Sequence, residues 1–144
     1  MNVHAPTRIR PLQILVADDD DDMLSLVCET LRADGHELSE AHDGAQLLER
    51  LEHAIDDPTH RPDVVVADVM MPRLSGLGVL EAIRRARLHF PVVLMTVLAD
   101  DSIWIVARRL GAIGVLHKPF DMDDLRTAVV NAVLAYTKSS GNSD

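Results

Sequence analysis

The stretch from Pro62 to Pro72 constrains the fold more than any other part of the sequence. Its apolar run, Val64 to Ala67, contains no polar residue, which is typical of a strand buried on both faces of a parallel sheet. Asp68 follows directly, where the carboxyl ends of parallel strands face the crevice in which open α/β sheets bind ligands. Pro72 cannot continue a strand, so the chain must turn just after Asp68. Asp68 is therefore the first candidate for chemistry.

Other apolar runs resemble this strand and alternate with segments of helical periodicity. The expected strands comprise residues 12–17, 37–41, 64–67, 91–96 and 113–116. The expected helices follow them, with apolar stripes made of Leu24, Val27, Cys28 and Leu31; Leu47, Leu48, Leu51 and Ile55; Val79, Leu80, Ile83 and Ala86; Ile103, Val106, Ala107 and Leu110; and Leu125, Val129, Ala132 and Tyr136. Because parallel strands need right-handed crossovers, this alternation predicts one doubly wound α/β sheet of five parallel strands with five helices.

Capping signals place the ends of these helices. Asp21 or Asp22 is positioned to cap the first helix, and Gly35 to end it. Asp43 with Gln46 three residues later resembles a capping box, so the second helix is expected to begin there.

Length and composition favour a single domain. The 144 residues are 47% hydrophobic, enough for one well-buried core. We expect a flexible leader at residues 1–11, the domain at residues 12–137 and a polar tail at residues 138–144. Because the sequence has no apolar run of roughly 20 residues and no signal-peptide core, we expect a cytoplasmic protein.

The charge balance limits the partners. With 14 Lys and Arg against 23 Asp and Glu, the formal charge of −9 argues against direct binding of nucleic acid or of an anionic membrane. Cys28 is the single cysteine, which excludes an internal disulfide and a Cys-based zinc cluster. The seven histidines are scattered and form no metal-ligand pattern.

Polar residues lie at the end of four of the expected strands or just beyond it. They are Asp18 and Asp19, Asp68, Thr96 and Lys118. Since the carboxyl ends of parallel strands meet at one edge of a sheet, the topology gathers them into one site. Each residue alone is better explained as a cap, a strand end or an ion-pair partner, but their common location favours a functional site.

The chemistry of this set indicates phosphoryl transfer. Clustered carboxylates repel one another and provide the oxygen ligands that Mg²⁺ prefers. The ammonium of Lys118 and the hydroxyl of Thr96 are suited to holding phosphoryl oxygens around a carboxylate nucleophile. The set therefore predicts transfer of a phosphoryl group onto an aspartate.

With these residues assembled, the chain resembles the response regulator receiver domains of the CheY type, which belong to two-component signal transduction. The resemblance covers residues 12–136 and is carried by Ile14 to Asp20, Asp68 to Pro72 with Gly76, Pro91 to Thr96, and Lys118 to Phe120. Each motif is weak alone, but in this order and spacing the motifs are highly specific. The resemblance implies a flavodoxin-like sheet of order 2-1-3-4-5.

The resemblance also implies roles for the site residues. Asp68 would be the phosphoacceptor, charged by the phosphohistidine of a sensor histidine kinase or a histidine phosphotransfer protein. Asp19, Asp68 and the Met70 backbone carbonyl would ligate Mg²⁺, or Mn²⁺ in its place, with Asp18 acting largely through water. A domain of this kind catalyses its own phosphorylation and dephosphorylation but serves mainly as a phosphorelay switch.

Thr96 and Lys118 would hold the phosphoryl oxygens in this family. Thr96 is also a switch residue there, and an aromatic residue usually stands three positions before the lysine. Here that position is Val115, and the bulky Val97 follows the threonine. Because of these two differences from the family pattern, the usual aromatic switch mechanism is in doubt for this chain.

Met70 and Leu98 occupy the two variable positions that flank the acceptor in this family. Apolar side chains at these positions are expected to restrict an attacking water. Our hypothesis is therefore a fairly long-lived phosphoryl group.

Apolar residues outside the core stripes suggest an output surface. Trp104 and Ile105 on the fourth helix, and Val130 and Leu134 on the fifth, would form a face that binds a downstream protein or a second copy. Single exposed apolar residues are also common without a partner, and Trp104 could simply stack on Arg108.

Two other readings of the acidic residues fail on particular positions. The run after the first strand imitates a calcium loop, but Met23 occupies the position of the required glycine. An aspartyl phosphatase expects a second aspartate two residues after the first, where this chain has Met70.

Three alternatives for the output remain open. We expect a stand-alone receiver, because little sequence follows Tyr136. The chain could equally be the receiver part of a larger regulator or of a hybrid kinase. A receiver-like interaction module that is never phosphorylated is the third, although the complete set of acidic, Thr and Lys residues argues against it.

Overall fold

The computed structural model describes residues 10–98 and 100–141, and most of the predicted leader lies outside the described residues. Its strands are β1 (Gln13–Ala17), β2 (Glu37–Ala41), β3 (Val64–Asp68), β4 (Val92–Thr96) and β5 (Gly114–His117). Its helices are α1 (Asp21–Ala33), α2 (Gly44–Asp56), the short 3-10 helix η1 (Pro58–His60), α3 (Gly76–Arg85), α4 (Asp101–Arg109) and α5 (Met122–Gly141). All strand pairs are parallel in the order β2-β1-β3-β4-β5, which confirms the predicted α/β sheet.

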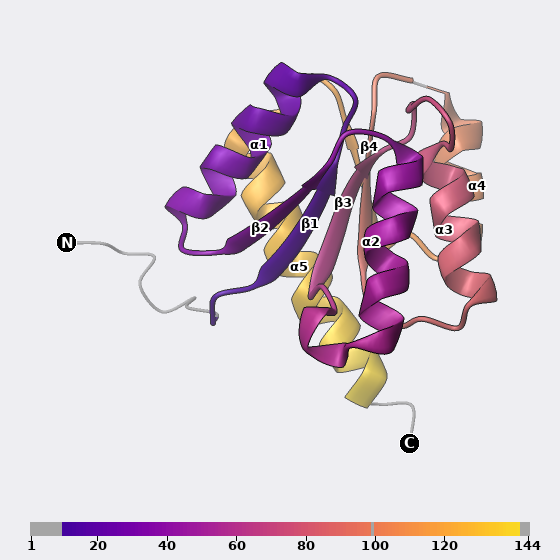
Figure 1. Cartoon of the computed structure of the whole chain (residues 1–144). Coiled ribbons are helices and arrows are strands. Elements are labelled where there is room, and N and C mark those ends of the chain that lie inside the picture. The colour runs from indigo at the N-terminus through magenta and orange to yellow at the C-terminus, as the bar shows by residue number, and fades with distance from the viewer. Residues whose placement is uncertain (1–9, 99, 142–144) are drawn as a thin grey trace.

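The helices divide the core into two layers (Figure 1). One apolar cluster joins the sheet to α2, α3 and α4, and the other joins it to α1 and α5. Along β3, Val65 and Ala67 belong to the first cluster, whereas Val64 and Val66 belong to the second. Every residue of β3 and β4 is buried, which explains their unbroken apolar sequence.

The cap of α1 lies one or two residues earlier than predicted. Asp20 has extended backbone geometry, and its Oδ1 accepts hydrogen bonds from the backbone N–H groups of Asp22 and Met23. Asp21 and Asp22 are already helical, so they cannot serve as caps.

The cap of α2 is confirmed, but its capping box is only half formed. Asp43 Oδ1 accepts from the backbone N–H of Gln46 at 2.8 Å. The Oε1 of Gln46 accepts a hydrogen bond from the backbone N–H of His42, whereas a complete capping box would use the N–H of Asp43.

Three predicted core positions are wrong. Ile55 and Val106 are 50% and 41% exposed, and Ala86 is exposed at the end of α3. In α2 the buried position is Ala54, because it lies seven residues and two helical turns after Leu47.

Helix α5 continues to Gly141, so regular structure extends past the predicted domain end at residue 137.

Within residues 10–98 and 100–141, no helix has the length and apolar character that crossing a bilayer requires.

Candidate functional site

The carboxyl ends of four adjacent strands bring the predicted site residues together at the upper edge of the sheet in Figure 1. Asp18 follows β1, Asp68 ends β3, and Thr96 ends β4; all three are buried. Lys118 follows β5. The site therefore combines residues that lie up to 100 positions apart in the sequence.

Lys118 is the electrostatic centre of the site. Its Nζ lies 2.8 Å from Asp18 Oδ2 and 2.6 Å from Asp68 Oδ2. The Lys118 side chain is only 11% exposed, so water screens these ion pairs weakly. One ammonium thus holds two buried carboxylates that would otherwise repel each other.

Backbone amides hold the other carboxylate oxygens. Asp18 Oδ1 accepts from the N–H of Asp20 at 3.0 Å, and Asp68 Oδ1 accepts from the N–H of Met70 at 2.8 Å. Each aspartate therefore fixes the first turn of the loop that follows its strand. These bonds also aim the carboxylates into the site.

Burial and neighbouring charges set the protonation of Asp18 and Lys118. Burial raises the pKa of the Asp18 carboxyl; the charge of Asp68 adds to this shift, and Lys118 opposes it. Burial also acts to lower the pKa of the Lys118 ammonium, but the hydrogen bonds to Asp18 and Asp68 and the charges of these two residues together outweigh burial, so that pKa is raised. Lys118 is consequently a fixed positive charge at neutral pH.

The acidic residues are close enough to share a cation. Asp18, Asp19 and Asp68 each offer a carboxylate oxygen, and the three atoms lie within 4.8 Å of one another. Asp19 is exposed, which leaves the cluster open to solvent on one side. An all-oxygen donor set of this kind fits a hard divalent ion such as Mg²⁺.

Thr96 completes the edge of the site. Its Oγ1 accepts from the backbone N–H of Leu98 at 2.9 Å, and its carbonyl accepts from the N–H of Lys118 at 2.7 Å. Thr96 therefore links the loop after β4 to the lysine. Its hydroxyl proton is not used by the Leu98 contact, because the oxygen acts there as an acceptor.

Comparison with known proteins agrees with this geometry. Residues 14–130 match the sequence profile described as "Response regulator receiver domain". This chain belongs to the response regulator receiver domains. It is 32% identical over 122 residues to the alkaline phosphatase synthesis transcriptional regulatory protein PhoP of Bacillus subtilis. The aligned region covers 85% of this chain and 48% of that protein.

Other relatives give the same picture. The receiver is 34% identical to the transcriptional regulatory protein CpxR of Escherichia coli K12, over 85% of this chain and 49% of that protein. It thus spans about half the length of these relatives. A receiver domain structure from Clostridium thermocellum superposes with a TM-score of 0.76 at 31% identity, over 88% of this chain and 98% of the other. The receiver domain of the Francisella response regulator 1452 gives 0.74 at 28% identity, over 89% and 98%.

Two glycines of the receiver make close backbone contacts that the sequence did not predict. Gly76 has no left-handed backbone; instead, a Cβ there would overlap the carbonyl oxygen of Asp68. A Cβ on Gly44 would overlap the Leu74 carbonyl oxygen. These close approaches pack the loop after β3 onto the first turns of α3 and α2, and only the folded distances reveal them.

The remaining predicted residues lie outside the acidic cluster. Val115 is half-buried and packs against the core on the α4 side. Trp104, Ile105 and Leu134 are 44%, 52% and 49% exposed, whereas Val130 is half-buried. Two further exposed apolar residues, Val106 and Ile113, lie on or near α4 and were not predicted to be exposed.

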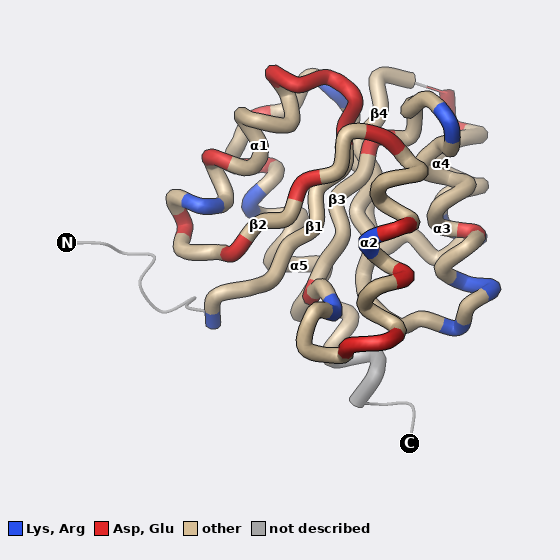
Figure 2. Tube along the Cα trace, viewed as in Figure 1, with Lys and Arg blue, Asp and Glu red and all other residues tan. Residues whose placement is uncertain are grey.

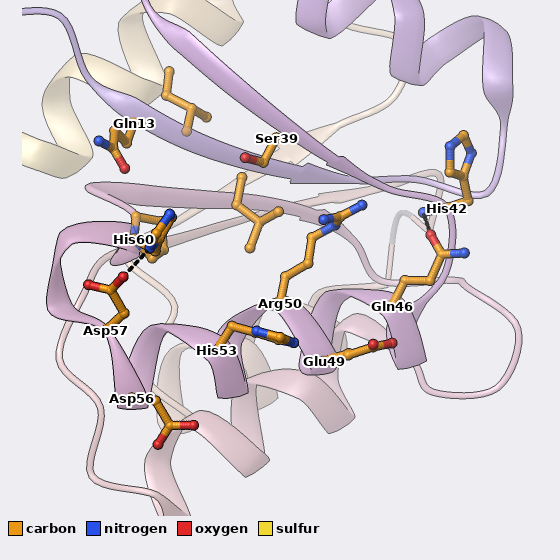
Figure 3. A pocket seen from close by; sticks show the side chains of 13 residues that line it. Gln13, Ser39, His42, Gln46, Glu49, Arg50, His53, Asp56, Asp57 and His60 are labelled. Atoms are coloured by element: carbon orange, nitrogen blue, oxygen red, sulfur yellow. Dashed lines mark hydrogen bonds and ion pairs between the residues drawn. The ribbon is translucent and has the colours of Figure 1, made fainter.

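A groove of the described residues lies away from the acidic cluster. It has a volume of about 750 Å³ and opens between helix α2 and the strands β1 and β2 (Figure 3). Ser39, Arg50 and His53 line it, and His60 Nδ1 lies 2.6 Å from Asp57 Oδ2 at one end. None of the acidic-cluster residues lines this groove, so we assign it no part in the chemistry.

Proposed function

We propose that Asp68 accepts a phosphoryl group from the phosphohistidine of a sensor histidine kinase or a histidine phosphotransfer protein. An Asp68 oxygen attacks phosphorus, the P–N bond breaks, and the imidazole nitrogen keeps the electron pair and takes up a proton from solvent. The product is an aspartyl phosphate. The observation that carries this proposal is the position of buried Asp68, in an ion pair with Lys118 at the carboxyl edge of a parallel sheet.

Lys118 and Thr96 hold the transferred group in this proposal. Phosphorylation changes Asp68 into a neutral acyl group that carries phosphoryl oxygens, so the ammonium of Lys118 moves from the carboxylate to those oxygens. The Thr96 hydroxyl donates its free proton to another of them. Both contacts strengthen as charge develops on the phosphoryl group, which is the requirement for catalysis.

Asp18, Asp19, Asp68 and the Met70 carbonyl are the residues that we propose hold Mg²⁺ or Mn²⁺, with Asp18 acting largely through water. When bound, the cation neutralises phosphoryl oxygens. The all-oxygen cluster supports this assignment.

Hydrolysis resets the switch. A water attacks phosphorus, inorganic phosphate leaves, and the Asp68 carboxylate is restored. Met70 follows Asp68 by two residues and is 53% exposed, and Leu98 follows Thr96 by two residues and is 38% exposed. We propose that these apolar side chains restrict the attacking water and lengthen the lifetime of the phosphoryl group.

Intact-mass spectrometry tests the proposal. Incubation with acetyl phosphate and Mg²⁺ is expected to add one phosphoryl group to the parent, and none to Asp68→Asn or to the parent with chelator. Removal of the donor then gives the lifetime from the decay of the adduct. An unmodified parent, even with beryllofluoride as a trapping analogue, would refute phosphorylation, and rapid decay would refute the proposed long lifetime.

The output surface is a separate proposal. Trp104, Ile105, Val130 and Leu134 lie on α4 and α5, and we propose that they bind a downstream protein or a second copy after phosphorylation. Trp104→Glu is expected to abolish self-association induced by beryllofluoride in sedimentation experiments. Unchanged self-association of that variant would contradict the assignment to a dimer interface.

One observation favours an alternative. Val115 stands where related domains usually carry an aromatic ring, so the side chain on which the usual coupling between acceptor and output surface depends is missing. A receiver-like interaction module that is never phosphorylated would explain this. The relatives are about twice as long, so the chain could also serve as the receiver part of a larger regulator or a hybrid kinase instead of acting alone.

A further inference from the structure

Arginines gather at one corner of this otherwise acidic molecule. The adjoining ends of α3 and α4 carry five of the fourteen basic residues, all exposed: Arg84, Arg85, Arg87, Arg108 and Arg109. We call these five residues the arginine cluster. Figure 2 shows part of it as blue at the lower end of α3, away from the red segment between β1 and α1.

The fold uses only part of this charge. The Arg84 guanidinium donates to the Arg109 carbonyl and so ties the ends of the two helices together. Arg85 pairs with Glu81 at 2.7 Å. Basic residues in a last helical turn also favour the helix dipole, which accounts for some of the cluster but not for Arg87, which lies beyond the helix.

Arg87 occupies a position that favours glycine. Helix α3 ends in a Schellman motif, in which the N–H of Arg87 donates to the Arg84 carbonyl and the N–H of Leu88 donates to the Ile83 carbonyl. The motif places Arg87 in the left-handed region at φ 56°. A side chain there costs about 1 kcal/mol relative to glycine.

The same chain uses glycine at the two equivalent positions. Helices α1 and α4 end in the same hydrogen-bond pattern, with Gly35 at φ 94° and Gly111 at φ 100°. The arginine at the end of α3 is therefore not explained by the turn. The exposed Arg87 therefore occupies a backbone conformation in which glycine would be more favourable.

We infer that the arginine cluster docks a carboxylate-rich segment of a partner protein. Arginine rather than lysine fills every position, and the planar guanidinium suits bidentate carboxylate recognition. The Arg108 guanidinium lies 5.5 Å from the ring centroid of Trp104, which gives the cluster an aromatic border typical of protein interfaces. A long polyanion such as RNA is disfavoured because the formal charge of the whole chain is −9.

The location separates this docking from the phosphoryl chemistry. Helices α3 and α4 end at the edge of the sheet opposite the Asp68 site, because they run antiparallel to the strands that precede them. A partner bound there leaves Asp68 open to a phosphodonor. Docking is consequently expected without phosphorylation, and it does not rest on the proposed function of Asp68.

Fluorescence anisotropy with a labelled oligoglutamate peptide tests the inference. The parent is expected to bind with an affinity that falls as salt is raised. Changing Arg87→Gly together with Arg109→Gln should weaken binding about fivefold to tenfold, which corresponds to the summed free energies of two exposed ion pairs. Arg73→Gly is the matched control, because Arg73 also has a left-handed backbone, at φ 73°, but lies in the loop after β3.

The outcomes separate the possibilities. Weaker binding by the Arg87→Gly/Arg109→Gln variant and unchanged binding by Arg73→Gly, with a melting temperature of Arg87→Gly equal to or above that of the parent, support a docking role. Four results overturn it: no peptide binding, unchanged binding by the Arg87→Gly/Arg109→Gln variant, equal loss in Arg73→Gly, or a lower melting temperature of Arg87→Gly. Binding of labelled poly(U) RNA at least as tightly as oligoglutamate would overturn the assignment to a protein segment.

Discussion

Lys118 determines the electrostatics of the site because it is the cation between two buried carboxylates. Its contacts to Asp18 and Asp68 are 2.8 and 2.6 Å, and Asp18 is completely buried. Without the ammonium, two like charges would face each other in a poorly solvated site. The lysine is thus both a structural partner in the resting state and a proposed ligand of the phosphoryl group.

Replacing this lysine tests its structural role. Lys118→Met is expected to lower the free energy of unfolding at neutral pH by about 3 kcal/mol, because it leaves buried carboxylates unpaired. Urea denaturation measures this loss. The double variant Lys118→Met/Asp68→Asn removes one of the carboxylates and should recover part of it; a single variant as stable as the parent would refute the argument.

His36 gives the fold a defined pH dependence. Its Nδ1 accepts a hydrogen bond from the N–H of Leu12 at 3.0 Å, which requires an unprotonated nitrogen. Burial lowers the pKa of this imidazole, although the charges of Asp34 and Asp63 oppose the shift. Because the unfolded chain binds the proton more readily, the stabilisation is complete above the unfolded pKa of about 6.5 and is lost as the pH falls through the lower folded pKa.

Urea titrations at about pH 7.5 and pH 5.5 should therefore show a loss of stability on acidification, of which His36 contributes about 1 kcal/mol, the net value of one hydrogen bond. His36→Gln removes the titrating group and should reduce the difference between the two pH values. An equal difference in the variant would show that other groups cause the acid sensitivity.

Among the elements, the central strands could be predicted from sequence and α4 could not. Strands β3 and β4 are covered on both faces, so burial requires an uninterrupted apolar run. Helix α4 has a regular apolar stripe, yet only Ala107 is fully buried. It packs near the edge strand β5, whose own residues are half-exposed, so less apolar surface is available for it to cover.

Contacts between loops were also beyond prediction. Gly76 belongs to one of the motifs that carry the family resemblance, but its role in the structure is the close approach of α3 to the Asp68 carbonyl. Such a distance depends on how a strand, a loop and a helix pack together. No local pattern in the sequence encodes it.

Gly76→Ala tests this close approach. The added Cβ overlaps backbone, which must shift at Asp68, so we expect a loss of about 2 kcal/mol in unfolding free energy and slower phosphorylation by acetyl phosphate. Gly78→Ala is the matched control, because the nearest atom to its Cβ would be the movable end of the Leu74 side chain, at 2.7 Å, and not backbone. Equal effects of the two substitutions would contradict the proposed role of Gly76.

At the scale of the whole molecule, the topology of the sheet brings together site residues that lie far apart in the sequence. The parallel order β2-β1-β3-β4-β5 places the ends of β1, β3, β4 and β5 side by side, and the predicted acidic, Thr and Lys residues meet there. Their identities and strand positions could be predicted, because polar residues after buried strands stand out. The bridging geometry of Lys118 could not, since it depends on side-chain reach across the finished sheet.

The acidic cluster links metal binding to the stability of the whole domain. A cation that binds only the folded chain stabilises it by about 2.7 kcal/mol at a hundredfold excess over its dissociation constant. Mg²⁺ is therefore expected to raise the melting temperature of the parent in scanning calorimetry. Asp19→Asn should reduce this rise, and the same rise in that variant would argue against a site at the acidic cluster.

The central claim is that Asp68 itself carries the phosphoryl group, and chemical mapping of the modified residue tests it most directly. After incubation with acetyl phosphate and Mg²⁺, borohydride reduces an aspartyl phosphate to homoserine, which peptide mass spectrometry locates in the sequence. The account predicts homoserine at position 68 alone. Homoserine at position 18 or 19, or none in a sample whose intact mass shows the adduct, would contradict it.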